Sequence, residues 1–172
     1  VFGLAEKHGR PVDIHLHEPD ELGAISMELI IERTRALGMQ GHVTVSHAFS
    51  LGTPDEADFA RTADALAEAG VHILTSSPSF GIVPPVHALR ARGVVIHAGS
   101  DNIRDLWSPF GNGDMLERAF LVSLKQGFRS DPDIAVALGI CSDAEALGQQ
   151  AHRLVVGAPA DLVAVESETP QE

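Results

Sequence analysis

The chain has 172 residues, of which 44% are hydrophobic and 21% are charged, and its 24 acidic against 12 basic residues give a formal net charge of -12. This composition predicts a folded globular protein with a sizeable core and excludes intrinsic disorder. The acidic balance argues against nucleic-acid binding, because contact with phosphates needs a cationic surface. No uninterrupted apolar run of about 18 residues occurs, so no membrane span or membrane partner is predicted.

The N-terminal segment VFGLAEKHGR lacks the basic-then-apolar order of a secretory signal, and we expect a cytoplasmic protein. Cys141 is the single cysteine, so neither an intrachain disulfide nor a site with several thiolates can form. Any tightly bound metal ion must therefore be held by imidazole and carboxylate groups.

Short β-branched segments alternate with helical patterns along the chain. Strands are predicted at residues 10–18, 41–49, 71–79 and 94–102. Helices are predicted at residues 20–38, 53–70, 86–93 and 113–127, with shorter ones near 131–139 and after Ser142. Each long helical segment can cross over a sheet, so a parallel arrangement of the strands is expected.

The segment 53–70 carries the most complete set of helix-end signals. Thr53 is predicted as its N-cap, with Pro54 at the first helical position, Glu56 at the third and Gly70 just after the end.

Four buried parallel strands with intervening helices fit either an open doubly wound sheet or a (β/α)8 barrel. Both architectures bind ligands at the carboxyl ends of their strands. Polar side chains occupy those ends in this sequence: His15, His17, His47, Ser76, Ser77, Asp101 and Asn102. The segment FGNGDML is a weak match to a dinucleotide fingerprint, and we interpret it as a loop that precedes a helix.

His15 and His17 lie two residues apart on a strand, so their side chains point the same way, and Glu18 follows on the other parity. The segment HEPDE does not fit the zincin pattern, which needs a second histidine four residues further along a helix. Any single histidine here, His47 included, is also consistent with a simple hydrogen bond to a neighbouring loop.

Asp101 ends an almost wholly apolar strand. An unpaired carboxylate buried there would be costly, and either a metal ion or the backbone N–H groups of the next loop would compensate for it.

The segments DIHLHE, VTVSHA, GSDNIRDLWSPFGNGDML and VVGAPADLVAVE follow one another in this order. The order resembles the metal-dependent amidohydrolase superfamily, specifically its cytosine deaminase-like branch. The resemblance implies an α/β fold, the (β/α)8 TIM barrel, of which residues 1–153 supply roughly strands five to eight, while residues 154–172 return toward a small β-sandwich. It also implies one divalent metal ion, zinc or iron, and deamination or removal of an alkylamine from a nitrogen heterocycle by a metal-bound hydroxide.

Carried over residue by residue, the resemblance makes His15 and Asp101 metal ligands and Glu18 the acid that passes a proton to a ring nitrogen. It implies that His47 orients the water and that Asp101 also collects the water's proton. Trp107 would lie at the mouth of the pocket, where its ring could cover a flat substrate or pack the loop onto the barrel rim.

Two positions depart from the cytosine-specific pattern: His17 stands where that pattern has an acid, and Asn102 where it has an aspartate. We expect His17 and Asn102 to contact substrate. Because an asparagine both donates and accepts hydrogen bonds, the preferred ring substituents can differ from those of cytosine, and a related pyrimidine, a pterin or a triazine fits as well.

A complete barrel takes about 250 residues, so this chain cannot supply eight strands. We expect it to pair with a missing N-terminal half of the barrel that carries a His-x-His metal pair, and residues 1–9 fit the end of the fourth barrel helix. Homo-oligomerisation stays open. Two alternatives also stay open: an inactive or fragmentary barrel relative that binds small molecules, and an open α/β sheet enzyme of unrelated chemistry.

Overall fold

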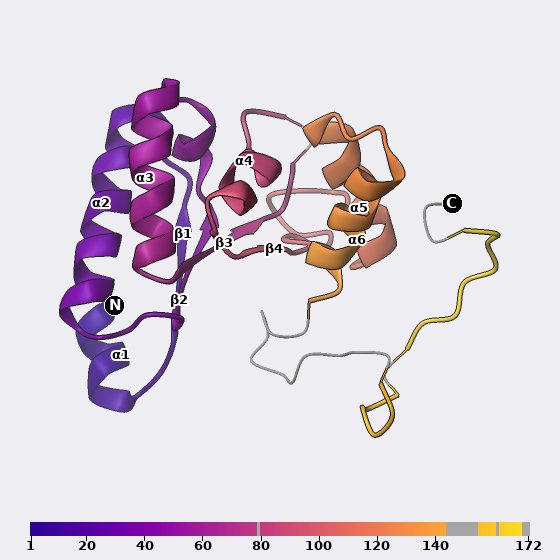
Figure 1. Cartoon of the computed structure of the whole chain (residues 1–172), viewed down its shortest axis with the longest axis horizontal. Helices are drawn as coiled ribbons and strands as arrows, with labels where there is room; N and C mark the ends of the chain where they lie inside the picture. Colours follow the sequence, from indigo (N-terminus) through magenta and orange to yellow (C-terminus); the bar gives the residue numbers. More distant parts are fainter. Residues whose placement is uncertain (79, 144–154, 161, 170–172) are drawn as a thin grey trace.

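The computed structural model describes residues 1–78, 80–143, 155–160 and 162–169. Within them, four parallel strands form one sheet in the order β1-β2-β3-β4. The strands are β1 (Val12–Leu16), β2 (Val43–His47), β3 (Val71–Thr75) and β4 (Ile96–Ala98). The helices are α1 (Phe2–His8), α2 (Asp20–Ala36), the short 3-10 helix η1 (Phe49–Gly52), α3 (Glu56–Glu68), α4 (Val86–Ala91), α5 (Met115–Gln126) and α6 (Asp131–Cys141). Consecutive strands are neighbours, as in an arc of a (β/α)8 barrel, and Figure 1 shows α2 and α3 side by side along β1 and β2.

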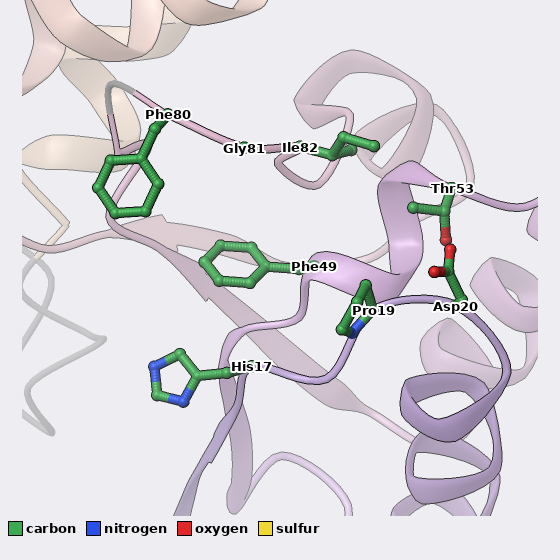
Figure 2. A pocket seen from close by; sticks show the side chains of 8 residues that line it. All are labelled: His17, Pro19, Asp20, Phe49, Thr53, Phe80, Gly81 and Ile82. Atoms are coloured by element: carbon green, nitrogen blue, oxygen red, sulfur yellow. The ribbon is translucent and has the colours of Figure 1, made fainter.

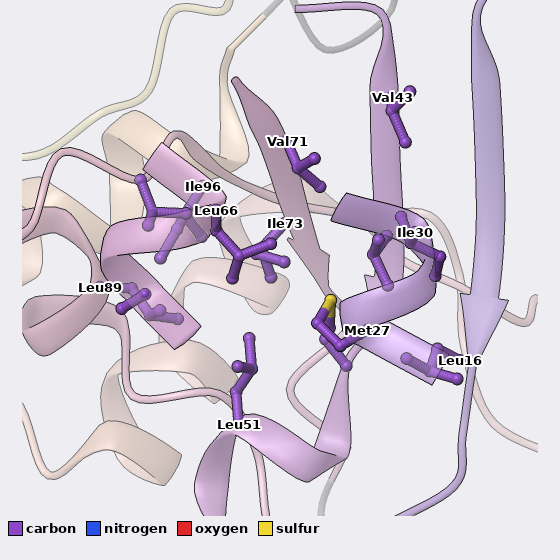
Figure 3. Packing of buried hydrophobic residues seen from close by; sticks show 14 of the residues in the cluster. Leu16, Met27, Ile30, Val43, Leu51, Leu66, Val71, Ile73, Leu89 and Ile96 are labelled. Carbon is purple, nitrogen blue, oxygen red and sulfur yellow. The ribbon is translucent and has the colours of Figure 1, made fainter. Parts of the chain in front are cut away.

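One face of the sheet carries the hydrophobic core. The register pairs Val43 with Val71 and Ile73 with Ile96, and these side chains pack against helical residues such as Met27, all of them at most 4% exposed (Figure 3). Because side chains alternate along a strand, every second residue is committed to this helix-covered face.

The opposite face carries polar side chains. Asp13 pairs with Thr44, and His15 pairs with Ser46, so these four positions share that face. Asp13 and His15 are exposed, and the Ser46 hydroxyl donates a 2.7 Å hydrogen bond to Oδ1 of Asp13. The sheet therefore separates a packed apolar layer from a polar layer that leads up to the histidines.

Three of the helices have capped ends that match their sequence. The Asp114 carboxylate accepts from the backbone N–H groups of Leu116 and Glu117 at the start of α5. Ser130 and Asp133 form a capping box at the start of α6.

The start of α3 corrects the sequence prediction: its N-cap is Asp55, whose side chain accepts a hydrogen bond from the N–H of Asp58. Thr53 lies two residues before this cap, and its hydroxyl instead donates a hydrogen bond to the carbonyl of Ser50.

All four strands are shorter than predicted, and hydrogen bonds explain the new bounds of two of them. β3 ends at Thr75, because Ser77 has a φ of 42° and its N–H donates to the Thr75 hydroxyl, which turns the chain away from the ladder. β4 begins only at Ile96, since the N–H of Val94 donates to the carbonyl of Leu89 and so belongs to the end of α4.

The structure describes only part of the C-terminal segment, so it tests only some of the predictions made there. The helix expected after Ser142 falls on residues outside those described, as does the domain boundary at 153. Residues 155–160 and 162–169 contain no helix or strand, and the β-sandwich segment there stays a prediction. Across the described ranges, none of the helices combines the length and the apolar character needed to cross a membrane.

Candidate functional site

Non-glycine residues with left-handed backbone conformations mark the ends of three neighbouring strands. His47 at the end of β2 has a φ of 71°, Ser77 after β3 has 42°, and Asp101 after β4 has 59°. Such conformations cost an L-residue about 1–3 kcal/mol each and concentrate at functional sites. This edge of the sheet is the one at which the sequence predicted a site.

Three histidines gather at this edge. His15 Nδ1 lies 3.1 Å from His47 Nε2, and the rings of His17 and His47 have centroids 4.2 Å apart with their planes tilted by 30°. One ring nitrogen from each of the three lies within 4.8 Å of the others. The predicted common face of His15 and His17 is thus confirmed, and His47 joins it from the next strand.

Asp101 approaches Nε2 of His47 from the loop after β4. Its Oδ1 lies 3.9 Å from Nε2 of His47, so His15 and Asp101 flank one imidazole nitrogen. His47 is 4% exposed. Burial lowers the pKa of His47, Asp101 opposes this by raising it, and the positive forms of His17 and His15 lower it further. The net decrease favours a neutral His47 imidazole, which can accept a hydrogen bond.

The donor set fits a divalent ion of the zinc or iron type. Imidazole and carboxylate suit both metals. The two predicted ligands approach one point, because Nδ1 of His15 and Oδ1 of Asp101 lie 3.1 Å and 3.9 Å from the same nitrogen of His47. The chemistry of these residues is therefore compatible with the metal that the sequence predicted.

Asp13 and Ser46 lie directly below the cluster, and the sequence analysis did not select them. Asp13 is two residues before His15 on the same face, and Ser46 precedes His47. Their side-chain hydrogen bond cross-links β1 and β2 just beneath the two histidines. The period of two in DIHLH was the available signal for Asp13, but the partner strand became visible only in the structure.

Glu18 is exposed and lies in the loop from β1 to α2. That loop packs tightly on α2: a Cβ built on Gly23 would lie 2.0 Å from the Glu18 carbonyl oxygen and 2.6 Å from Cβ of Ser50. Only a glycine allows this approach. The backbone position of Glu18 therefore depends on the first turn of α2.

The loop after β4 carries the two remaining candidates, Asn102 and Trp107. The Asn102 amide donates to a carboxylate oxygen of Asp105, whose other oxygen accepts from the N–H of Trp107 at 2.8 Å. These hydrogen bonds, with that of Asn102 first, lower the pKa of Asp105. The Trp107 residue is 89% exposed, so its ring is not packed onto the sheet.

Gly111 brings this loop back to its own start. Its φ is 107°, and a Cβ there would lie 2.4 Å from the Asn102 carbonyl oxygen. The side-chain amide of Asn102 is bound to Asp105 within this loop, and the ring of Trp107 is exposed. The structure does not bring either residue into the histidine cluster.

An open apolar groove of about 440 Å³ runs from His17 away from the cluster (Figure 2). Its apolar wall consists of Pro19, Phe49, Phe80 and Ile82. The ring of Phe49 lies 5.5 Å from that of His47 and 6.0 Å from that of His17, centroid to centroid. The sequence analysis missed Phe49, because the 3-10 helix that presents it was not predicted.

Residues 1–171 match the amidohydrolase family. The chain is 30% identical over 173 residues to the N-isopropylammelide isopropyl amidohydrolase of Pseudomonas sp., and the match covers 99% of this chain and 43% of that protein.

Two solved structures extend the likeness to three dimensions. The N-isopropylammelide isopropylaminohydrolase from Burkholderia multivorans has a TM-score of 0.83 and 45% identity, covering 87% of this chain and 39% of that one. The 5-methylcytosine deaminase from Klebsiella pneumoniae, liganded with 5-fluorocytosine, has a TM-score of 0.76 and 26% identity, covering 92% and 42%. The chain thus spans about two fifths of the length of the proteins that it matches.

Proposed function

The chain belongs to the amidohydrolase family, in its cytosine deaminase-like branch, and from that membership and its strand-end cluster we propose that it contributes to a metal-dependent hydrolase of nitrogen heterocycles. The reaction is the removal of an amine or a short alkylamine from a ring carbon of a pyrimidine, pterin or triazine. The observation that carries this proposal is the approach of His15 and Asp101 to the same nitrogen of His47.

We infer one zinc or iron ion, held by His15 and Asp101 together with a His-x-His pair from a part of the protein outside this chain. When bound, such an ion lowers the pKa of water toward neutrality and so supplies a nucleophile at physiological pH. The grouping of His17 with His15 and His47 favours a second candidate for His17, as a ligand in place of the predicted substrate contact.

The residues of this chain divide the proton transfers between them. The neutral Nε2 of His47 accepts a hydrogen bond from the attacking water and orients it, and the Asp101 carboxylate collects the proton that the water loses. Glu18 donates a proton to the ring nitrogen of the heterocycle as the ring carbon becomes tetrahedral. The proton collected by Asp101 then leaves with the departing amine. The proton that remains on the hydroxyl returns to Glu18 as the carbonyl forms, which restores both carboxyl groups and balances the reaction.

The groove beside the cluster supports an alkylamino substrate. Phe49, Phe80 and Ile82 offer an apolar surface that starts at His17, whose ring lies beside that of His47. A short branched alkyl group on the leaving nitrogen would gain about 25 cal/mol per Å² of apolar area that it removes from water there. Trp107 and Asn102 stay proposed substrate contacts, and a cytoplasmic location stays a proposal.

Metal analysis and a substrate panel on the intact protein test the function. We expect about one zinc or iron per chain, and turnover of alkylamino- or amino-substituted triazines or pyrimidines that a chelator abolishes. Asp101→Asn and His15→Asn should lower the metal content, and a similar loss in His17→Asn would make His17 a ligand. Full turnover after complete chelation would refute the proposal, and binding of a heterocycle without turnover would favour the inactive barrel relative.

A further inference from the structure

Arg118 joins the ends of two strands through its side chain. It lies in the first turns of α5, drawn in orange in Figure 1, and its guanidinium is partly buried. Nη1 donates to the backbone carbonyl of Ser76, and Nη2 donates to that of Ser100 at 2.8 Å. Ser76 directly follows β3, and Ser100 follows the end of β4 and directly precedes Asp101.

These two carbonyls lie just beyond the end of the backbone ladder. The last register pair of β3 and β4 is Thr75 with Ala98, and the N–H of Gly99 still donates to the Thr75 carbonyl. Past that point the strands turn, and a parallel ladder can supply no further N–H donor. The planar fork of an arginine presents two donors at a fixed spacing, so one guanidinium can continue the cross-link where the backbone stops.

The turn at Asp101 makes such support necessary. Asp101 has a φ of 59°, which an aspartate adopts only when its surroundings hold it there. The carbonyl that Arg118 holds belongs to the preceding residue, so its hydrogen bond restrains the peptide that leads into this turn. The Asp101 carboxylate in turn lies 3.9 Å from His47 Nε2.

The start of α5 is itself well fixed, so Arg118 projects from a rigid base. The Asp114 carboxylate caps two N–H groups of its first turn, and the amide of Asn112 donates to Glu117 at 2.7 Å. Because Arg118 donates two hydrogen bonds from this rigid helix end, it can fix the ends of both strands relative to α5.

We propose that Arg118 is a positioning residue: by clamping the carboxyl ends of β3 and β4, it holds Asp101 against His47 in the geometry that hydrolysis requires. The catalytic consequence of this inference rests on the proposed function. The clamp itself does not, because it restrains only the backbone of residues 99–104. The two hydrogen bonds of the guanidinium go to backbone carbonyls, so its proposed role is to hold the backbone in position.

The test compares Arg118→Met and Arg118→Lys with Arg92→Met in the intact protein. Arg92 is a matched control, because it is also an arginine of the helical layer but pairs with Asp64 at 2.8 Å before β4 begins. Hydrogen exchange of peptides covering 99–104 is measured together with kcat and KM. We expect Arg118→Met to speed exchange there at least about tenfold, and to lower kcat about 10- to 100-fold with KM within about twofold.

Arg118→Lys should fall between Arg118→Met and the wild type, since an ammonium can satisfy one carbonyl well but not both in the arginine geometry. This variant also decides the matter if Arg118→Met does not fold. Wild-type exchange at 99–104 and wild-type kcat in the folded Arg118 variants would overturn the proposal, and so would changes spread evenly over the sheet. If the wild type lacks hydrolase activity altogether, the proposed function fails, whereas the exchange experiment still decides whether the clamp exists.

Discussion

At the scale of single residues, the site combines groups in contrasting environments. His47 is buried and has a lowered pKa, whereas His15, His17 and Glu18 are exposed on the same edge of the sheet. A buried neutral imidazole beside accessible groups suits a reaction in which one group orients water and another delivers a proton.

Glu18→Gln tests the assigned proton donor. Glutamine keeps the shape of the side chain but cannot deliver the proton, so we expect metal content to be unchanged and kcat to fall by about 100-fold or more. Glu21→Gln is the matched control, because Glu21 is a nearby exposed glutamate in the first turn of α2. Equal turnover in the wild type and Glu18→Gln would remove Glu18 from the mechanism.

The lowered pKa of His47 predicts a loss of stability in acid. The unfolded chain takes up a proton at His47 near the ordinary pKa of 6.5, and the folded protein does so only at a lower pH. Between those two values the unfolded state binds more protons, so the free energy of unfolding falls as the pH drops through this window.

Urea denaturation of the metal-free protein at pH 7.5 and 5.5 measures this effect. His47→Gln lacks the titrating group and should lose less stability between the two pH values than the wild type does. An equal or larger acid-induced loss in His47→Gln would show that the imidazole is not held neutral by the fold.

At the scale of elements, the loops gain their shape from close approaches between neighbouring segments. The loop from β1 to α2 rests on Gly23, which lies against the Glu18 carbonyl and Ser50, and the loop after β4 rests on Gly111. In both places the missing side chain permits a close approach of the backbone. The position of Glu18 therefore depends on the first turn of α2, and that of Asn102 depends on the return of its own loop.

Gly23→Ala should therefore harm both stability and the site. The added methyl would lie 2.0 Å from the Glu18 carbonyl oxygen, so the loop or α2 must shift, at a cost of about 1–3 kcal/mol. Gly139→Ala is the control, since Gly139 also lies within a helix but has no atom within 4 Å of the new methyl. That variant should be more stable by about 0.5–1 kcal/mol.

Thermal or urea unfolding of the two variants, with turnover measured alongside, checks this contrast. If Gly23→Ala proves as stable and active as Gly139→Ala, the loop is free to move and its packing does not position Glu18.

At the scale of the whole molecule, one apolar layer holds the described elements together. The core runs from Val12 and Met27 to Leu89 and continues through Val122 to Cys141 at the end of α6, so residues far apart in the sequence share one cluster. Cys141 is 9% exposed, and its burial raises the pKa of the thiol to about 11.

Alkylation of Cys141 should consequently report global unfolding. Only the thiolate reacts, and a pKa of about 11 against an ordinary value of 9.0 leaves about 100-fold less thiolate at pH 8. We expect iodoacetamide to label the native protein at least about 100-fold more slowly than the urea-unfolded protein. The double variant Cys141→Ser/Ser142→Cys moves the thiol to an exposed neighbour and should react quickly in the folded state. Similar native rates for the two proteins would mean that the Cys141 thiol is not buried in the folded protein.

The sequence by itself determined the order and type of the four strands, the helices between them and the edge where the polar side chains gather. These features depend on local patterns of hydrophobicity and on the fact that parallel strands bring their carboxyl ends to one edge. His15, His17 and His47 could be selected for the same reason, because each lies at or next to the carboxyl end of a strand. The cap at Asp55, the early end of β3 and the 3-10 helix with Phe49 could not be predicted, because competing hydrogen bonds decide them.

Only the tertiary structure decided that Ser46 binds Asp13, that Arg118 bridges Ser76 and Ser100, and that the side chain of Asn102 donates to Asp105. The physical reason is that a pattern along one segment specifies which face a side chain takes, whereas its partner comes from another segment that only packing brings near.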